Sequence, residues 1–193
     1  MQKAFLNLTI FLFLIAPADL AFAQQLSTKS KQVLTVYNQL QSCPGSKTCA
    51  LNYIEVFPDD TAQFLRVFAP ADFGQLYKSS DNFIDEFFKL SRYHSVLVIN
   101  KAIDIGKDLK WDADAVGYLQ HGIVALGNRY TRLFILKINS LKPKEQSNLI
   151  TFLADVENHD AYPEYKKLIK SINDAGRTDL ADKFKTAMIQ REK

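Results

Sequence analysis

The fold class turns on one stretch, Val96-Leu97-Val98-Ile99-Asn100-Lys101-Ala102-Ile103-Asp104-Ile105-Gly106. Its first four residues are largely β-branched, so propensity alone allows a strand. A strand needs partners, and no other segment of the chain has comparable strand character. The spacing of Ile99, Ile103 and Ile105 instead fits a helix that ends at Gly106. We therefore predict an all-α protein.

Helical spacing continues on both sides of this stretch. Apolar residues recur every three or four positions in several further segments, chiefly 26–40, 83–90, 130–138, 149–156 and 180–188. Prolines and glycines, such as Pro58, Pro70 and Gly176, separate the segments. The pattern predicts about eight to nine short helices, arranged as a compact multi-helix bundle or a short irregular α-solenoid. No stretch repeats another, which speaks against the solenoid.

The first 23 residues have the order of a cleavable export signal. Lys3 precedes an apolar run from Ala4 to Ala16, Pro17 breaks it, and Ala21-Phe22-Ala23 places small residues where a signal peptidase reads them. The run is shorter than the roughly 20 residues that a membrane-spanning helix needs, although an uncleaved membrane anchor is the alternative. We predict a signal peptide at 1–23, cleaved before Gln24, and a single helical domain at 24–193. The mature protein is expected in the periplasm or secreted, with no stable membrane anchor.

The only two cysteines, Cys43 and Cys49, flank a Pro44-Gly45 pair that favours a turn. In an oxidising compartment such a pair forms a local disulfide. Two ligands are too few for a metal site, and the Cys-x-x-Cys spacing of redox-active pairs is absent. The sequence therefore predicts a structural disulfide.

The charge distribution and the missing motifs argue against a nucleic acid partner and against a cofactor. The chain has 24 Lys and Arg against 21 Asp and Glu, and the two signs are interspersed. Because no basic block stands out, we expect no nucleic acid partner. The chain also lacks a phosphate-binding glycine loop, Gly-x-Ser-x-Gly and His-Glu-x-x-His, so we expect no cofactor.

One polar group could carry chemistry. Asp114, Tyr118 and His121 share one helix face by their spacing. Two turns, roughly 10 Å, separate the aspartate from the histidine, so they would have to bracket a ligand or meet a third residue. The alternative interpretation is that Asp114 serves the helix start while Tyr118 and His121 are packed side chains.

A second polar group contains Asp155, Glu157, His159 and Asp160. Oxygen ligands in a turn can hold a hard cation, but this spacing matches no calcium loop. A polar helix end followed by an aspartate cap explains the cluster equally well. We therefore predict no metal site.

Aromatic residues divide into two groups. Core-facing spacing places Phe87, Phe88, Phe134 and Phe152 inside the fold. By contrast, Trp111 and the two tyrosines flanking Pro163 are candidate exposed anchors for a partner protein. The candidate binding residues are Trp111, Tyr118, Tyr162 and Tyr165.

These features favour a protein-binding module, periplasmic or secreted, with another protein as its partner and no chemistry of its own. In general form, an exported helical domain with a disulfide and mixed surface charge, the chain resembles periplasmic immunity proteins that neutralise toxins delivered by neighbouring bacteria. The resemblance implies an inhibitor-like role. Two alternatives stay open, a hydrolase-type enzyme with its site around Asp114 and His121, and a carrier of an apolar ligand between the Phe-rich helices.

Overall fold

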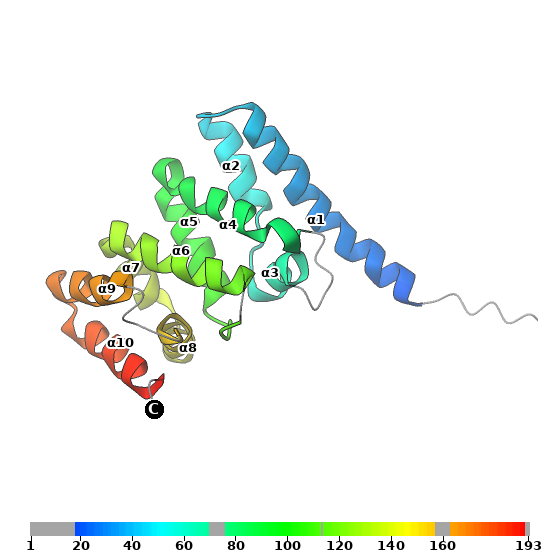
Figure 1. Ribbon diagram of the computed structural model, residues 1–193. Coiled ribbons are helices and arrows are strands. Elements are labelled where there is room, and N and C mark those ends of the chain that lie inside the picture. The colour runs from blue at the N-terminus through cyan, green and yellow to red at the C-terminus, as the bar shows by residue number, and fades with distance from the viewer. Residues whose placement is uncertain (1–17, 70–75, 113, 157–162, 192–193) are drawn as a thin grey trace, which may run out of the picture.

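The computed structural model describes the backbone of residues 18–69, 76–112, 114–156 and 163–191, and within those ranges the side chains of residues 28–190. Over these residues the secondary structure is helical, with ten α-helices, one 3-10 helix and no strand. The prediction of a compact all-α protein is confirmed, and the expected eight to nine helices come close to ten (Figure 1).

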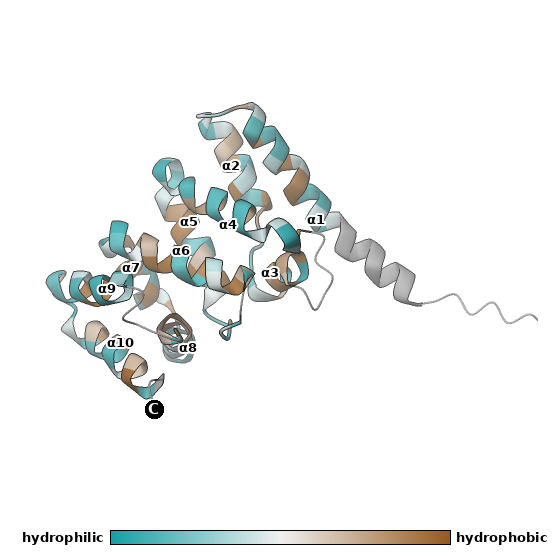
Figure 2. Cartoon of the chain, viewed as in Figure 1, coloured by the Kyte–Doolittle hydropathy of each residue, from teal (hydrophilic) through white to brown (hydrophobic). Residues whose placement is uncertain are grey.

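The elements follow one another as α1 (Ala18–Ser42), α2 (Lys47–Val56), α3 (Thr61–Phe68), η2 (Tyr77–Ser79), α4 (Ser80–Lys89), α5 (Ser91–Gly106), α6 (Ala115–Arg129), α7 (Thr131–Ser140), α8 (Pro143–Ala154), α9 (Pro163–Asp174) and α10 (Thr178–Arg191). The arrangement follows the chain from one end of the molecule to the other. The pair α1 and α2 lies at one end, and the pair α9 and α10 at the other (Figure 1). Hydrophilic residues cover the outward turns of α1, α4 and α9 (Figure 2).

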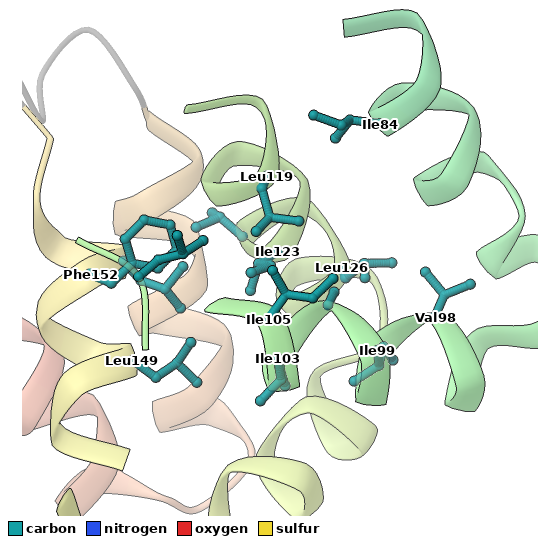
Figure 3. Close-up of a cluster of buried hydrophobic side chains, with 14 of the residues drawn as sticks. Ile84, Val98, Ile99, Ile103, Ile105, Leu119, Ile123, Leu126, Leu149 and Phe152 are labelled. Atoms are coloured by element: carbon teal, nitrogen blue, oxygen red, sulfur yellow. The ribbon is translucent and has the colours of Figure 1, made fainter. Parts of the chain in front are cut away.

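The decisive stretch forms the C-terminal part of α5. Its residues Val98, Ile99 and Ile103 are buried in the hydrophobic cluster, which Figure 3 draws with side chains of α4, α6 and α8. The first four residues of the stretch differ in exposure. Val98 and Ile99 are buried, whereas Val96 and Leu97 are 51% and 44% exposed. Packing against neighbouring helices, rather than propensity, thus selects the helix here.

A single hydrophobic cluster includes buried residues from all ten α-helices. Three of the four predicted core phenylalanines, Phe87, Phe134 and Phe152, are buried, and Phe88 is partly buried against them. The ring of Phe87 stacks on that of Phe57 with a centroid distance of 4.0 Å. The Phe-rich helices are therefore in contact through their own side chains.

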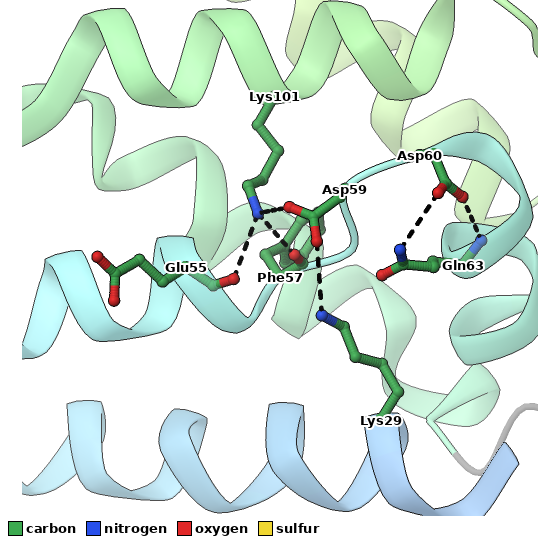
Figure 4. Close-up of polar contacts among 7 residues, drawn as sticks. All are labelled: Lys29, Glu55, Phe57, Asp59, Asp60, Gln63 and Lys101. Atoms are coloured by element: carbon green, nitrogen blue, oxygen red, sulfur yellow. Dashed lines mark hydrogen bonds and ion pairs between the residues drawn. The ribbon is translucent and has the colours of Figure 1, made fainter. Parts of the chain in front are cut away.

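Lys101 of α5 binds the connection between α2 and α3, which also contacts α1. Its Nζ donates hydrogen bonds to the backbone oxygen of Phe57, at 2.8 Å, and to Oδ1 of Asp59, at 2.5 Å (Figure 4). Lys29 of α1 approaches the other oxygen of Asp59 at 3.9 Å. The next residue, Asp60, caps α3 by accepting a hydrogen bond from the Gln63 backbone, as an aspartate at this position predicts.

The predicted disulfide is present, since the sulfurs of Cys43 and Cys49 are bonded across the turn between α1 and α2. The predicted cleavage point, before Gln24, lies within α1, whose N-terminal turns project beyond the other helices (Figure 1). Among the side chains of α1 that the structure describes, which start at Thr28, the first buried one is that of Ser30. Cleavage before Gln24 would leave Ser30 in the mature chain. Over the described residues, no helix is both long enough and apolar enough to cross a membrane.

Candidate functional site

A groove of about 510 Å³ lies where the connection between α5 and α6 meets α8. We name it the Trp111 groove, and it is lined by Asp108, Leu109, Lys110, Trp111, Asn148, Thr151, Phe152 and Asp155. Leu109 and Phe152 are 6% and 2% exposed, whereas the indole of Trp111 is 40% exposed. The groove thus combines an apolar floor with an exposed aromatic ring at its edge.

The connection that carries Trp111 is anchored at its beginning, next to the end of α5. The backbone of Leu109 donates to the oxygen of Gly106, and the Leu109 side chain is buried. A β-carbon on Gly106 would lie 2.8 Å from Cδ1 of Ile123, so the end of α5 packs tightly against α6. Lys107 donates to Glu145 in the first turn of α8 at 2.8 Å. Asp108, Lys110 and Trp111 therefore lie next to the anchored residues Lys107 and Leu109.

A buried glutamine holds the opposite wall of the groove. The side chain of Gln120, 1% exposed, donates to the backbone oxygens of Phe152, at 2.6 Å, and Asp155, at 3.0 Å. These carbonyls belong to the end of α8, where the last backbone oxygens of a helix have no N–H partner within the helix. Sequence reasoning missed Gln120, although its position between Leu119 and Ile123 on an otherwise apolar helix face was an available signal.

Lys107 and Glu145 shift each other's pKa in the directions that keep both side chains ionised. The hydrogen bond to Glu145 raises the pKa of Lys107, and the same bond lowers the pKa of Glu145. A backbone hydrogen bond from Lys142 lowers the Glu145 pKa further. Both groups stay ionised at neutral pH and satisfy each other, so neither contributes a free charge to the groove.

Asp114 lies at the start of α6, where its backbone has φ 59° and ψ −117°, a region that non-glycine residues seldom occupy. Its carboxylate makes no capping bond and instead accepts a hydrogen bond from the hydroxyl of Tyr77 at 2.5 Å. That bond raises the pKa of Tyr77. Asp114 is the residue directly before α6, which begins at Ala115.

His121 lies on α6 against the start of α9. Its ring packs edge-on against Tyr165, with centroids 5.7 Å apart, and Nδ1 lies 3.4 Å from Oε1 of Glu164. Tyr165 is only 3% exposed, because it occupies the inner face of α9 with Leu168 and Ile172, so it is not an exposed anchor.

The remaining candidates divide between exposed and undescribed positions. Tyr118 is 42% exposed on α6. Asp155 lines the Trp111 groove, while Tyr162, Glu157, His159 and Asp160 lie outside the described residues. Within the described part of the chain, no three His, Cys, Asp or Glu side chains are grouped so that they could hold a metal ion.

The structure does not bring Asp114 and His121 to one site. Asp114 is bonded to Tyr77 of η2, whereas His121 contacts Glu164 and Tyr165 of α9. Neither residue lines the Trp111 groove or the second described groove, about 470 Å³ between α8 and α10. Of the predicted site residues, the Trp111 groove contains Trp111 alone. It also contains Asp155, from the polar cluster for which we predicted no metal site, and Asn148 and Thr151 from α8, which no pattern in the sequence singled out.

Comparison with protein-family models, with curated proteins and with solved structures finds no match to this chain, so its function has to be argued from the site.

Proposed function

We propose that this protein is an exported protein-binding module, periplasmic or secreted, which acts through the Trp111 groove and has no chemistry of its own. The observation that carries the proposal is the exposure of Trp111 beside the apolar floor formed by Leu109 and Phe152. Tryptophans that fill or border such depressions are the residue type most often found to dominate binding energy in protein interfaces.

The hydrogen bonds that hold the walls of the groove support this role. The two walls are held by the Lys107 to Glu145 pair and by the two hydrogen bonds of Gln120. A preformed surface loses little conformational entropy when a partner binds. The form of binding that we propose is that of an inhibitor or immunity protein, which needs a fixed recognition surface and no reactive group.

The two alternatives have less support. A hydrolase-type site needs its acid and base around one substrate, but Asp114 and His121 have separate partners on η2 and α9. An apolar-ligand carrier needs a cavity between the Phe-rich helices, where the rings of Phe57 and Phe87 stack on each other instead.

Site-specific photo-crosslinking tests the proposal. A photoreactive amino acid replaces Lys110, an exposed residue of the groove, in the chain produced by its native cells. We expect one stoichiometric cross-linked protein that is lost when Trp111→Ala is added. The matched control is the same amino acid at Leu136 of α7, which is 65% exposed and outside the groove. The absence of a cross-link from position 110, or the same products from position 136, would overturn the proposal.

A further inference from the structure

We propose that the Trp111 groove receives a basic side chain, an arginine or a lysine, presented by the partner protein. This inference rests on the proposed function and specifies the chemistry that the groove selects. Three features of the groove carry it, namely its local charge, its exposed indole and its apolar floor.

The charge around the groove is opposite to that of the whole chain. The chain has a formal net charge of +3, yet the groove is lined by the carboxylates of Asp108 and Asp155 and by one cation, Lys110. Two carboxylates against one ammonium give the lining of the groove a net negative charge, which favours a basic occupant.

Two lysines near the connection between α5 and α6, Lys107 and Lys137, are each paired with a carboxylate outside the groove. Lys107 is bonded to Glu145, and Lys137 of α7 is bonded to Asp104. Asp108 itself is exposed and has no ion pair within the described part of the chain. Its carboxylate is therefore available at the edge of the groove.

The apolar part of the groove matches the other half of a basic side chain. Arginine and lysine carry a chain of methylene groups that packs on apolar surface while the charged end stays near water. Leu109 and Phe152 supply that surface, and the face of the exposed Trp111 ring can hold a guanidinium or ammonium by a cation–π interaction. A purely apolar occupant would desolvate the carboxylate of Asp108 without giving it a partner, and an acidic occupant would be repelled.

Trp111 makes the test direct because it is the only tryptophan of the chain. Its fluorescence is recorded at low ionic strength while the mature chain is titrated with the acetylated, amidated peptide Gly-Arg-Gly-Arg-Gly. The matched peptide carries citrulline, the neutral isostere of arginine, at both positions. We expect a saturable change with the arginine peptide and roughly tenfold weaker binding of the citrulline peptide, the order of magnitude for one charge-assisted contact with a cation–π interaction.

Three variants locate the effect. Asp108→Asn is expected to weaken binding of the arginine peptide several-fold, whereas Lys110→Gln is expected to strengthen it, since it removes the one competing cation. Asp85→Asn, an exposed aspartate of α4 outside the groove, is the matched control and leaves binding unchanged.

Equal binding of the arginine and citrulline peptides, no saturable change with either, or an unchanged affinity in Asp108→Asn would overturn the inference. These results are distinguishable from failure of the proposed function. If position 110 still cross-links one partner while the arginine peptide does not bind, protein binding stands and the basic side chain is excluded. If neither is observed, both proposals fall.

Discussion

The ring of Phe88 lies against the backbone of Gly122, so that a β-carbon built on this glycine would be 2.0 Å from Cε2 of the ring. Phe88 belongs to α4 and Gly122 to α6, and these two helices pack directly on each other. The absence of a side chain at position 122 therefore sets how closely α4 approaches the helix that leads into the Trp111 groove.

Replacement of Gly122 by alanine is expected to destabilise the protein by about 1–3 kcal/mol, because the added methyl group forces the Phe88 ring to move in a packed environment. Urea unfolding followed by circular dichroism measures the effect. Gly117→Ala is the matched control on the same helix, since its nearest neighbour, the backbone oxygen of Asp112, is 4.0 Å away. The control is expected to gain up to about 1 kcal/mol from helix propensity. Equal effects of the two substitutions would contradict the contact.

Lys101→Met is expected to destabilise the protein by about 2 kcal/mol. The substitution keeps an unbranched side chain that is only one atom shorter but removes the donor shared by Phe57 and Asp59, and hydrogen bonds to charged groups contribute roughly 1.5–3 kcal/mol. Thermal unfolding checks this value against Lys89→Met, which removes a largely exposed ammonium 3.6 Å from Glu86 and should change stability by less than about 0.5 kcal/mol. A Lys101 variant as stable as the Lys89 variant would show that the hydrogen bonds of Lys101 drawn in Figure 4 do not contribute to the free energy of unfolding.

Gln120→Leu is expected to destabilise the protein by about 1–3 kcal/mol and to shift the emission of Trp111. The leucine fits the apolar face of α6 but leaves the buried oxygen of Phe152 without its donor. Since the end of α8 forms one wall of the Trp111 groove, its displacement changes the surroundings of the indole. Gln190→Leu, at an exposed position of α10, is the control and should alter neither property. An unchanged emission maximum in the Gln120 variant would indicate that the groove does not depend on this hydrogen bond.

Sequence reasoning could predict the helices because their signals are local. The spacing of Ile99, Ile103 and Ile105 specified a helix over a β-branched run, and all three residues are buried in α5. Glycines also predicted where some helices end. Gly176 follows α9 with φ +80°, the left-handed conformation that a C-terminal glycine cap supplies.

The candidate site was predicted only in part because it is assembled from distant segments. Trp111 was identified by its residue type and its place after a helix end, but Asn148 and Thr151 enter the groove from α8 through tertiary packing. Tyr165 shows the converse. It has the residue type of an anchor, yet the inward face of α9 buries it beside His121. Residue type alone does not determine which aromatic residues face solvent.

Protonation of Asp179 is expected to reduce stability at acid pH. Arg177 donates two hydrogen bonds to this carboxylate, at 2.8 Å and 2.7 Å, and they lower its pKa from 3.8 to about 2. Because the pKa in the folded protein is below that in the unfolded chain, the interaction stabilises the fold fully above about pH 4 and is lost as the pH falls toward 2. Unfolding free energies measured between pH 5 and pH 2 should therefore fall less steeply in Asp179→Asn than in the unsubstituted protein. Asp182→Asn, which removes a carboxylate paired with Lys185 on the same helix, is the control and should retain the loss caused by Asp179. Identical pH profiles for the unsubstituted protein and Asp179→Asn would show that the bonds to Arg177 do not persist in solution.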